Sequence, residues 1–313
     1  MRRLIIICLL LLGTVSLRAQ EVVRQTYHYA THEGQELLLD RYTLSGECSE
    51  PRPCMIFAFG GGFVRGERDH EYYTIYFDEL AKAGIVVVSI DYRLGLNQLP
   101  KKRGIRAMID VMSNAVNIAV EDIYAATNYV LANAEAWGVD SSKIMLSGSS
   151  AGAITALQAE WMRCNGAERA KVLPENFKYA GIVSCAGAIY STKGKPRFKS
   201  EPAPMLLFHG TSDSNVPYDH AAILGVGFYG SQYITEQLDK LGTPYLFYSA
   251  EYENHTLAGT PLIYQCDFIL QFINDYVLRG NKLRVEHNVT NLEGEKRPTR
   301  FTVKQYLKSN YKR

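Results

Sequence analysis

The chain has 313 residues, of which 47% are hydrophobic and 21% are charged, and its formal net charge is +2. This length is ample for a buried core, and the composition is that of an ordinary globular protein. The small net charge and the lack of a concentrated basic run argue against nucleic acid as a partner.

The first twenty residues, MRRLIIICLLLLGTVSLRAQ, have the pattern of a secretory signal peptide. Two arginines precede an apolar run from Leu4 to Leu12, and small and polar residues follow up to Ala19. We predict a signal peptide over residues 1–19, with cleavage after Ala19 or Gln20, and hence a secreted or periplasmic protein. The apolar run is short for a transmembrane span, so we expect no stable membrane insertion after cleavage. An uncleaved anchor is the alternative.

Five cysteines follow the predicted signal peptide: Cys48, Cys54, Cys164, Cys185 and Cys266. Cys48 and Cys54 flank a short loop that can close as a disulfide in an oxidising compartment. Cys185 lies in the apolar run GIVSCAGA and is predicted to be a buried thiol. Neither the spacing of the cysteines nor the neighbouring histidines indicate a metal site.

Along the chain, strand and helix patterns alternate. Residues 24–31 and 35–44 read as a β-hairpin around the turn HEGQ. Further strands are predicted over residues 54–60, 85–94, 143–148, 179–188, 204–210 and 244–251, and helices over residues 72–84, 119–138, 231–242, 261–280 and from Ser150 onward. This alternation predicts an α/β fold, with a mostly parallel central sheet covered by helices on both faces and an antiparallel N-terminal hairpin.

The domain organisation is predicted to be simple. The chain has no internal repeat and no low-complexity linker, so we expect residues 20–313 to form one domain. A long connection from Asn97 to Asn117 leads to the helix over residues 119–138. The polar tail of residues 280–313 has no predicted place in the fold.

The sequence GSSAG, Gly148 to Gly152, fits the pattern G-x-S-x-G and joins a predicted strand to a predicted helix. In that context the pattern forms a sharp turn that lifts its serine above a sheet. The turn also directs the helix N-terminus and the amide of Ala151 toward charge that develops beside the serine. We therefore predict that Ser150 is a nucleophile rather than a plain turn residue.

A second glycine-rich turn, FGGGF, follows the strand over residues 54–60. Its spacing matches neither the phosphate-binding nor the dinucleotide-binding glycine pattern. Close backbone approach at glycines instead suits an oxyanion hole, formed by the amides of Gly61 and Gly62 together with Ala151.

A serine nucleophile needs a base and an acid that orients the base. His255 follows the last predicted strand, and Asp213 follows the preceding one, which gives the order serine, acid, histidine of this kind of sheet. Asp91 is the rival acid, although it precedes Ser150. The other histidines are assigned elsewhere: His28 and His32 to the hairpin, His70 and His220 to positions that precede or begin helices, His209 to a structural role and His287 to the tail.

Residues from about Cys54 to about Gly280 resemble an α/β-hydrolase, and more narrowly the esterases of the hormone-sensitive-lipase and carboxylesterase type. The segments that carry the resemblance are FGGGF, SIDYRL, VEDIYAATNYVLANAEAWGVDSSKIMLSGSSAG, LLFHGTSDSNVPY and ENH. The resemblance implies esterase activity without metal or organic cofactor. It implies Ser150 as nucleophile, His255 as base and Asp213 as acid, with the oxyanion hole formed by Gly61, Gly62 and Ala151.

The chain departs from this family at Phe59, where the family has a histidine before its three glycines. That histidine mostly braces the loop, so its replacement leaves the backbone donors in place and makes the cleft more apolar. The family's long N-terminal cap is also missing. We expect the segments from Asn97 to Asn117 and from His220 to Gly230 to roof the cleft instead.

The predicted function is that of an exported serine ester hydrolase, which acts on short-acyl or carbohydrate-linked (acetyl or feruloyl) carboxylic esters through an acyl-enzyme. A serine peptidase resembling the prolyl oligopeptidases is one alternative. A non-catalytic binding protein with a retired hydrolase site is the other. The sequence leaves acyl specificity and oligomeric state open.

Overall fold

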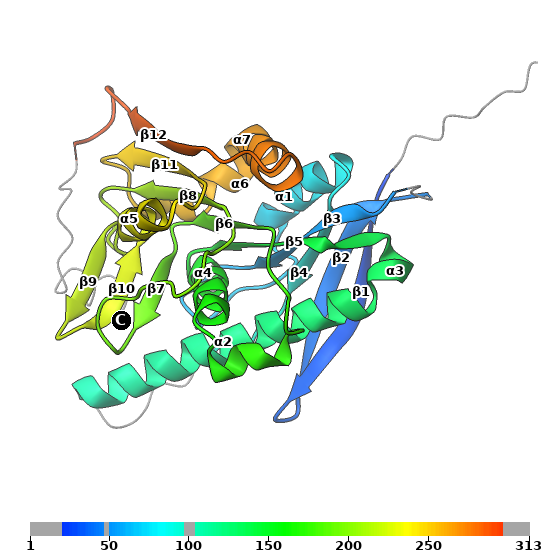
Figure 1. Cartoon of the computed structure of the whole chain (residues 1–313), viewed down its shortest axis with the longest axis horizontal. Coiled ribbons are helices and arrows are strands. Elements are labelled where there is room, and N and C mark those ends of the chain that lie inside the picture. Colours follow the sequence, from blue (N-terminus) through cyan, green and yellow to red (C-terminus); the bar gives the residue numbers. More distant parts are fainter. Residues whose placement is uncertain (1–20, 47–49, 97–103, 297–313) are drawn as a thin grey trace, which may run out of the picture.

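A computed structural model of the chain describes residues 21–46, 50–96 and 104–296 (Figure 1). The predicted signal peptide lies outside these residues, as does Cys48, the proposed disulfide partner of Cys54. None of the helices in the described ranges combines the length and the apolar character that crossing a membrane requires.

Nine strands of the described chain form the central sheet in the order β1-β2-β4-β3-β5-β6-β8-β11-β12. At one edge of the sheet β2 pairs antiparallel with β1 and with β4, and all other neighbours in this sheet are parallel. This confirms the predicted mostly parallel sheet with an antiparallel N-terminal hairpin. The strands are β1 (Val22–His32), β2 (Gln35–Leu44), β3 (Arg52–Ala58), β4 (Val86–Ile90), β5 (Val139–Ser149), β6 (Gly181–Cys185), β8 (Met205–Gly210), β11 (Tyr245–Glu251) and β12 (Arg284–Thr290).

Helices lie on both sides of this sheet. In Figure 1, α1 and α7 lie on one side of the strands and α2 and α4 on the other, and α5 packs against β8 and β11. The α-helices are α1 (Glu71–Lys82), α2 (Ile105–Ala132), α3 (Ala134–Trp137), α4 (Ala151–Cys164), α5 (Ser231–Leu241), α6 (Thr260–Tyr264) and α7 (Cys266–Phe272). Shorter turns are η1 (Glu168–Val172), η2 (His255–Ala258) and the π-helical η3 (Ile273–Leu278).

The central strands are buried because helices cover both of their faces. Every residue of β4, β6 and β8 is buried, which accounts for their mostly apolar sequences. Cys185, at the end of β6, is fully buried as predicted. The carboxyl ends of parallel strands lie at one edge, so the loops that follow β3, β5, β8 and β11 are brought together there.

The helix α2 begins much earlier than predicted. The segment from Asn97 to Asn117 was expected to be a connection over the cleft, but the structure extends the helix back to Ile105; residues 97–103 lie outside the description. Buried Met112 and Val116 continue the helical apolar spacing toward the N-terminus. Ser113 does not interrupt the helix, because its hydroxyl donates to the carbonyl of Ile109 at 2.7 Å.

The segment from His220 to Gly230, for which the sequence predicted no strands, forms a β-hairpin that directly precedes α5. The hairpin consists of β9 (His220–Ile223) and β10 (Val226–Gly230), and β10 also pairs with β7 (Ala188–Ser191) in a separate three-stranded sheet. Leu224 and Gly225 connect β9 to β10, and both have positive φ angles, 50° and 80°. Two such residues are typical of a tight hairpin turn whose twist matches its strands.

The part of the C-terminal tail that the structure describes joins the central sheet. β12 pairs parallel with β11 and forms the edge of the sheet, and most of its residues are exposed. The preceding segment, predicted as one helix over residues 261–280, is divided between α6, α7 and η3. The tail therefore has a structural place that the sequence pattern did not reveal.

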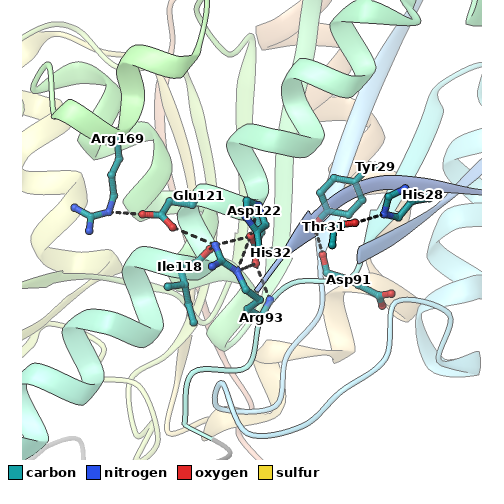
Figure 2. A network of polar contacts seen from close by, with 10 residues as sticks. All are labelled: His28, Tyr29, Thr31, His32, Asp91, Arg93, Ile118, Glu121, Asp122 and Arg169. Carbon is teal, nitrogen blue, oxygen red and sulfur yellow. Dashed lines mark hydrogen bonds and ion pairs between the residues drawn. The ribbon is translucent and has the colours of Figure 1, made fainter. Parts of the chain in front are cut away.

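A buried ion pair ties the hairpin, the β4 loop and α2 together (Figure 2). Asp122, fully buried on α2, accepts hydrogen bonds from the Arg93 amide at 2.7 Å and from Arg93 Nε at 3.0 Å. Arg93 also contacts Glu121 at 3.1 Å, and Nε2 of His32 lies 3.6 Å from Asp122 Oδ1. Burial raises the pKa of Asp122 despite the hydrogen bonds and the charge of Arg93.

Candidate active site

Ser150 occupies the sharp turn between β5 and α4. Its backbone has φ 50° and ψ −114°, a positive φ that residues other than glycine adopt at a cost. The turn is held by its amide, which donates to the carbonyl of Cys185 at the end of β6 at 2.9 Å. The side chain is half-buried at the carboxyl edge of the sheet.

The small residues around Ser150 are required by close backbone packing. A Cβ atom on Gly152 would lie 2.0 Å from the carbonyl oxygen of Ala58, and one on Gly148 would lie 2.4 Å from the backbone of Gly152. Both distances are far below van der Waals contact, so larger residues would force the start of α4 away from β3 and β5. The spacing of the glycines thus reflects the turn geometry.

Ser150, His255 and Asp213 form one hydrogen-bonded chain. The Ser150 hydroxyl donates to Nε2 of His255 at 2.8 Å, and Nδ1–H of His255 donates to Oδ2 of Asp213 at 2.7 Å. Asp213 is buried, whereas the His255 side chain keeps 20% of its surface exposed. The three sequence candidates therefore meet in the order that general-base activation of a serine requires.

The loops that carry His255 and Asp213 are bound to one another. After β8, the amide of Thr211 donates to the carbonyl of Ala250 at 2.9 Å, and that of Ser212 to the carbonyl of Glu253 at 2.9 Å. In return the amide of Tyr252, after β11, donates to the Thr211 hydroxyl at 2.9 Å. These hydrogen bonds between the two loops fix the separation between Asp213 and His255.

The environment of Asp213 favours its charged form. Burial alone raises its pKa, but contacts with His209 and His255 outweigh this and bring the pKa well below its ordinary value. The other carboxylate oxygen, Oδ1, accepts from the amides of Asn215 and Val216 at 2.8 and 2.9 Å. Asp213 is thus fixed as an acceptor.

His209 is held inside the Asp213 loop. It is fully buried; its Nδ1 accepts from the Ser231 hydroxyl at 2.8 Å, and Nε2–H donates to the carbonyl of Val216 at 3.2 Å. These contacts agree with the structural role expected for it. The rival acid, Asp91, instead binds Arg68 at 2.8 Å and the Leu38 amide at 3.3 Å.

The other histidines also have defined places. His28 and His32 belong to β1, His70 caps α1 by accepting from the amide of Tyr72 at 3.2 Å, and His287 lies in β12. Within the described ranges, no three His, Cys, Asp or Glu side chains are grouped as metal ligands.

The candidate oxyanion donors lie on two adjoining segments. Gly61 and Gly62 belong to the loop between β3 and α1, and Ala151 is the first residue of α4, where amides lack an intrahelical acceptor. Phe59 and Gly60 bring the two segments together: a Cβ on Gly60 would lie 2.9 Å from Ser149 Oγ. The glycine loop therefore runs directly beside the turn that holds Ser150.

Two tyrosines that sequence reasoning did not single out hold this loop. The Tyr92 hydroxyl donates to the carbonyl of Phe59 at 2.8 Å, and the Gly60 amide donates to the Tyr73 hydroxyl oxygen at 3.1 Å. Tyr92 lies inside the segment SIDYRL, which marked the resemblance, so its place in the sequence was a usable signal. Tyr73 is one of several tyrosines in α1 and carries no such signal.

The fold is similar to that of an esterase of known structure. A structure of Thermogutta terrifontis esterase 2 phosphoramylated by tabun has a TM-score of 0.60 and 21% sequence identity, covering 83% of this chain and 96% of that one. The same esterase with propionate bound has a TM-score of 0.59 and 21% identity, covering 84% and 96%. The chain has the α/β-hydrolase fold.

Part of the sequence is similar to a family model and to esterases. The BD-FAE family model matches residues 39–189, a range that contains the glycine loop and Ser150. Acetylcholinesterase of Gallus gallus is 34% identical over 117 residues, which is 37% of this chain and 14% of that protein. Esterase B1 of Culex pipiens is 34% identical over 109 residues, which is 34% of this chain and 18% of that protein. The chain thus matches less than a fifth of the length of these relatives.

Proposed function

We propose that the protein is a serine ester hydrolase that cleaves short-acyl or carbohydrate-linked (acetyl or feruloyl) carboxylic esters. The observation that carries the proposal is the hydrogen-bonded chain from Ser150 through His255 to Asp213, with distances of 2.8 and 2.7 Å. Such a chain lets a histidine remove the serine proton as the serine attacks a carbonyl.

In the first half of the reaction, Ser150 Oγ attacks the ester carbonyl carbon while His255 Nε2 takes the hydroxyl proton. Asp213 holds the imidazole in the required tautomer and stabilises the charge that forms on it. The amides of Gly61, Gly62 and Ala151 stabilise the tetrahedral oxyanion, and losing one such donor typically costs about 3 kcal/mol. The carbon–oxygen bond to the alcohol then breaks, and the alcohol leaves with the proton from His255.

In the second half, water repeats the sequence on the acyl-enzyme. His255 takes a proton from the water as its oxygen attacks the acyl carbonyl, and the same amides stabilise the second oxyanion. The bond to Ser150 Oγ breaks, the serine regains its proton from His255, and the carboxylic acid leaves. Every proton transfer in this sequence uses the side chains already joined by hydrogen bonds.

The proposal that the acyl group is short is supported by a comparison with a solved esterase structure. Thermogutta terrifontis esterase 2, whose fold this chain shares, has structures with propionate and with butyrate bound. These are short acyl groups, and we extend that size range to this chain. We also propose export, from the signal-peptide pattern of residues 1–19. N-terminal sequencing of the mature protein is expected to begin at Gln20 or Glu21, and a retained Met1 would contradict cleavage.

The deciding experiment compares initial hydrolysis rates of p-nitrophenyl acetate, butyrate and decanoate for the wild type and Ser150→Ala. The matched control is Ser142→Ala, an exposed serine at the start of the same strand. We expect rapid acetate and butyrate turnover in the wild type and the control, and its loss in Ser150→Ala. Equal rates in the wild type and Ser150→Ala would refute the proposal. Acetylated and feruloylated glycans would then be assayed to separate small esters from glycan esters.

A further inference from the structure

The peptide group between Phe59 and Gly60 is held from both sides by tyrosine hydroxyls. Its carbonyl accepts from the hydroxyl of Tyr92, at 2.8 Å, and its N–H donates to the hydroxyl oxygen of Tyr73, at 3.1 Å. Tyr73 comes from α1 and Tyr92 from the loop after β4, so two separate parts of the fold fix the orientation of one peptide plane.

Both tyrosine rings are themselves immobilised by packing. Tyr92 is buried, and its ring centroid lies 4.4 Å from that of Phe59 and 6.4 Å from that of Phe63. The Tyr73 ring lies 4.9 Å from Phe57, on β3. Burial raises the pKa of Tyr92 far above its ordinary value, so its hydroxyl remains a proton donor. The two contacts therefore come from side chains that pack against other aromatic rings.

The held peptide lies against the turn of the candidate nucleophile. A Cβ on Gly152, in the first turn of α4, would lie 2.5 Å from the Phe59 carbonyl oxygen, and one on Gly60 would lie 3.2 Å from the Ser149 carbonyl oxygen. Any rotation of this peptide would bring its atoms against the backbone on either side of Ser150. Its position is thus coupled to that of the nucleophile.

The other hydrogen bonds of the glycine loop leave the amides of Gly61 and Gly62 without an acceptor in the described part of the chain. The carbonyl of Gly61 accepts from the amides of Val64 and Arg65 at 3.2 and 3.3 Å, and the carbonyl of Phe63 accepts from Leu96 at 2.9 Å. Within residues 21–46, 50–96 and 104–296, the amides of Gly61 and Gly62 have no hydrogen-bond acceptor. These are the two loop donors assigned to the oxyanion.

We infer that Tyr73 and Tyr92 are positioning residues, which fix the Phe59–Gly60 peptide and thereby aim the amides of Gly61 and Gly62 at the oxyanion. The inference rests on the proposed function. The chain needs such a device because Phe59 offers no polar side chain to anchor the loop. Preorganised donors stabilise a transition state because they need no reorientation during the reaction.

The test uses Tyr73→Phe and Tyr92→Phe, which remove one hydroxyl each and keep the rings. The matched control is Tyr124→Phe, since the Tyr124 hydroxyl is also buried and donates to a backbone carbonyl, that of Ala159, at 2.7 Å. For p-nitrophenyl butyrate we expect kcat to fall about tenfold in the two test variants, with KM changed less than about twofold, because the loss concerns the transition state. The control should keep the wild-type kcat.

Two further measurements separate positioning from simple loss of stability. Inhibition by a trifluoromethyl ketone, whose serine adduct carries a tetrahedral oxyanion, should weaken by the same factor as kcat/KM falls. Amide hydrogen exchange in a peptide covering residues 57–66 should accelerate in both test variants and stay unchanged in Tyr124→Phe.

The measurements are made below the melting temperature of each variant. If Tyr73→Phe and Tyr92→Phe then keep the wild-type kcat and the wild-type affinity for the ketone, the inference is overturned. A wild-type protein without Ser150-dependent hydrolysis is a different result: it contradicts the proposed function, and the exchange rates alone then decide whether the tyrosines fix the loop. Unchanged exchange in that case would overturn the inference as well.

Discussion

His209 Nε2 lies 3.5 Å from Oδ2 of Asp213, the oxygen that also accepts the hydrogen bond from His255. One buried carboxylate oxygen therefore faces two imidazoles, of which one is fully buried and the other partly exposed. The buried ring is fixed by the Ser231 hydroxyl and the Val216 carbonyl. This arrangement keeps Asp213 oriented while His255 remains free to exchange its proton.

Asp213→Asn should lower kcat by about 10³- to 10⁴-fold, because an amide at this position no longer selects the tautomer of His255 that accepts the serine proton. The protein should still fold, since the substitution preserves shape. Asp91→Asn is the control, because Asp91 was the rival acid and its carboxylate binds Arg68. Steady-state kinetics on p-nitrophenyl butyrate checks this. A larger loss in Asp91→Asn than in Asp213→Asn would reverse the assignment.

The depressed pKa of Asp213 predicts a specific dependence of stability on pH. The folded-state pKa lies below the ordinary value of 3.8, so between these two values the unfolded chain binds more protons than the folded one. The contribution of Asp213 is therefore fully present above about pH 5 and is lost as the pH falls through the folded-state pKa.

Urea unfolding of the wild type and Asp213→Asn between about pH 6 and pH 3.5 measures this contribution. The stability advantage of the wild type should shrink toward the acid end of the range. An advantage that grows as the pH falls would contradict the assigned direction of the pKa change.

Gly152→Ala should destabilise the protein by about 3 kcal/mol or more, because the added methyl group would overlap the carbonyl oxygen of Ala58. Gly104→Ala is the matched control, since a Cβ there meets nothing within 4 Å and the backbone is extended. The control should cost less than about 1 kcal/mol. Chemical denaturation gives both values, and equal losses would show that the packing between β3 and α4 tolerates a side chain.

Asp122→Ala should cost about 3 kcal/mol of unfolding free energy, because it leaves the largely buried guanidinium of Arg93 without its main partner. The neighbouring Glu121 contacts the same guanidinium from a partly exposed position, with 36% of its side-chain surface accessible. Glu121→Ala should therefore cost less than about 1 kcal/mol. Urea unfolding of both variants gives the two losses of unfolding free energy. A larger loss in Glu121→Ala than in Asp122→Ala would contradict the prediction.

The sheet and the meeting of Ser150, Asp213 and His255 were predictable because both follow from local patterns. Apolar runs identify buried strands, and parallel strands bring their following loops to one edge. The start of α2 was not predictable from helix propensity, because Ser113 and its polar neighbours are poor helix formers. The burial of Met112 and Val116 in the core is what makes this segment helical.

The two tyrosines of the glycine loop illustrate a different limit. Their hydroxyls bind the backbone of Phe59 and Gly60, and a backbone group does not indicate in the sequence which side chain binds it. The segment SIDYRL drew attention to the region of Tyr92, but nothing in the sequence indicated its partner or singled out Tyr73. The β9–β10 hairpin was missed for a simpler reason: its turn uses Leu224, a residue that rarely adopts a positive φ.

The backbone of Ser150 has a positive φ that a β-carbon disfavours, and such a residue costs about 1–3 kcal/mol. Glycine would adopt the same angles freely, so the chain forgoes part of its possible stability in order to present a hydroxyl there. Mutational drift toward greater thermal stability would accordingly favour glycine at position 150 and loss of the hydroxyl. A serine at this position is thus maintained against the conformational preference of its own backbone.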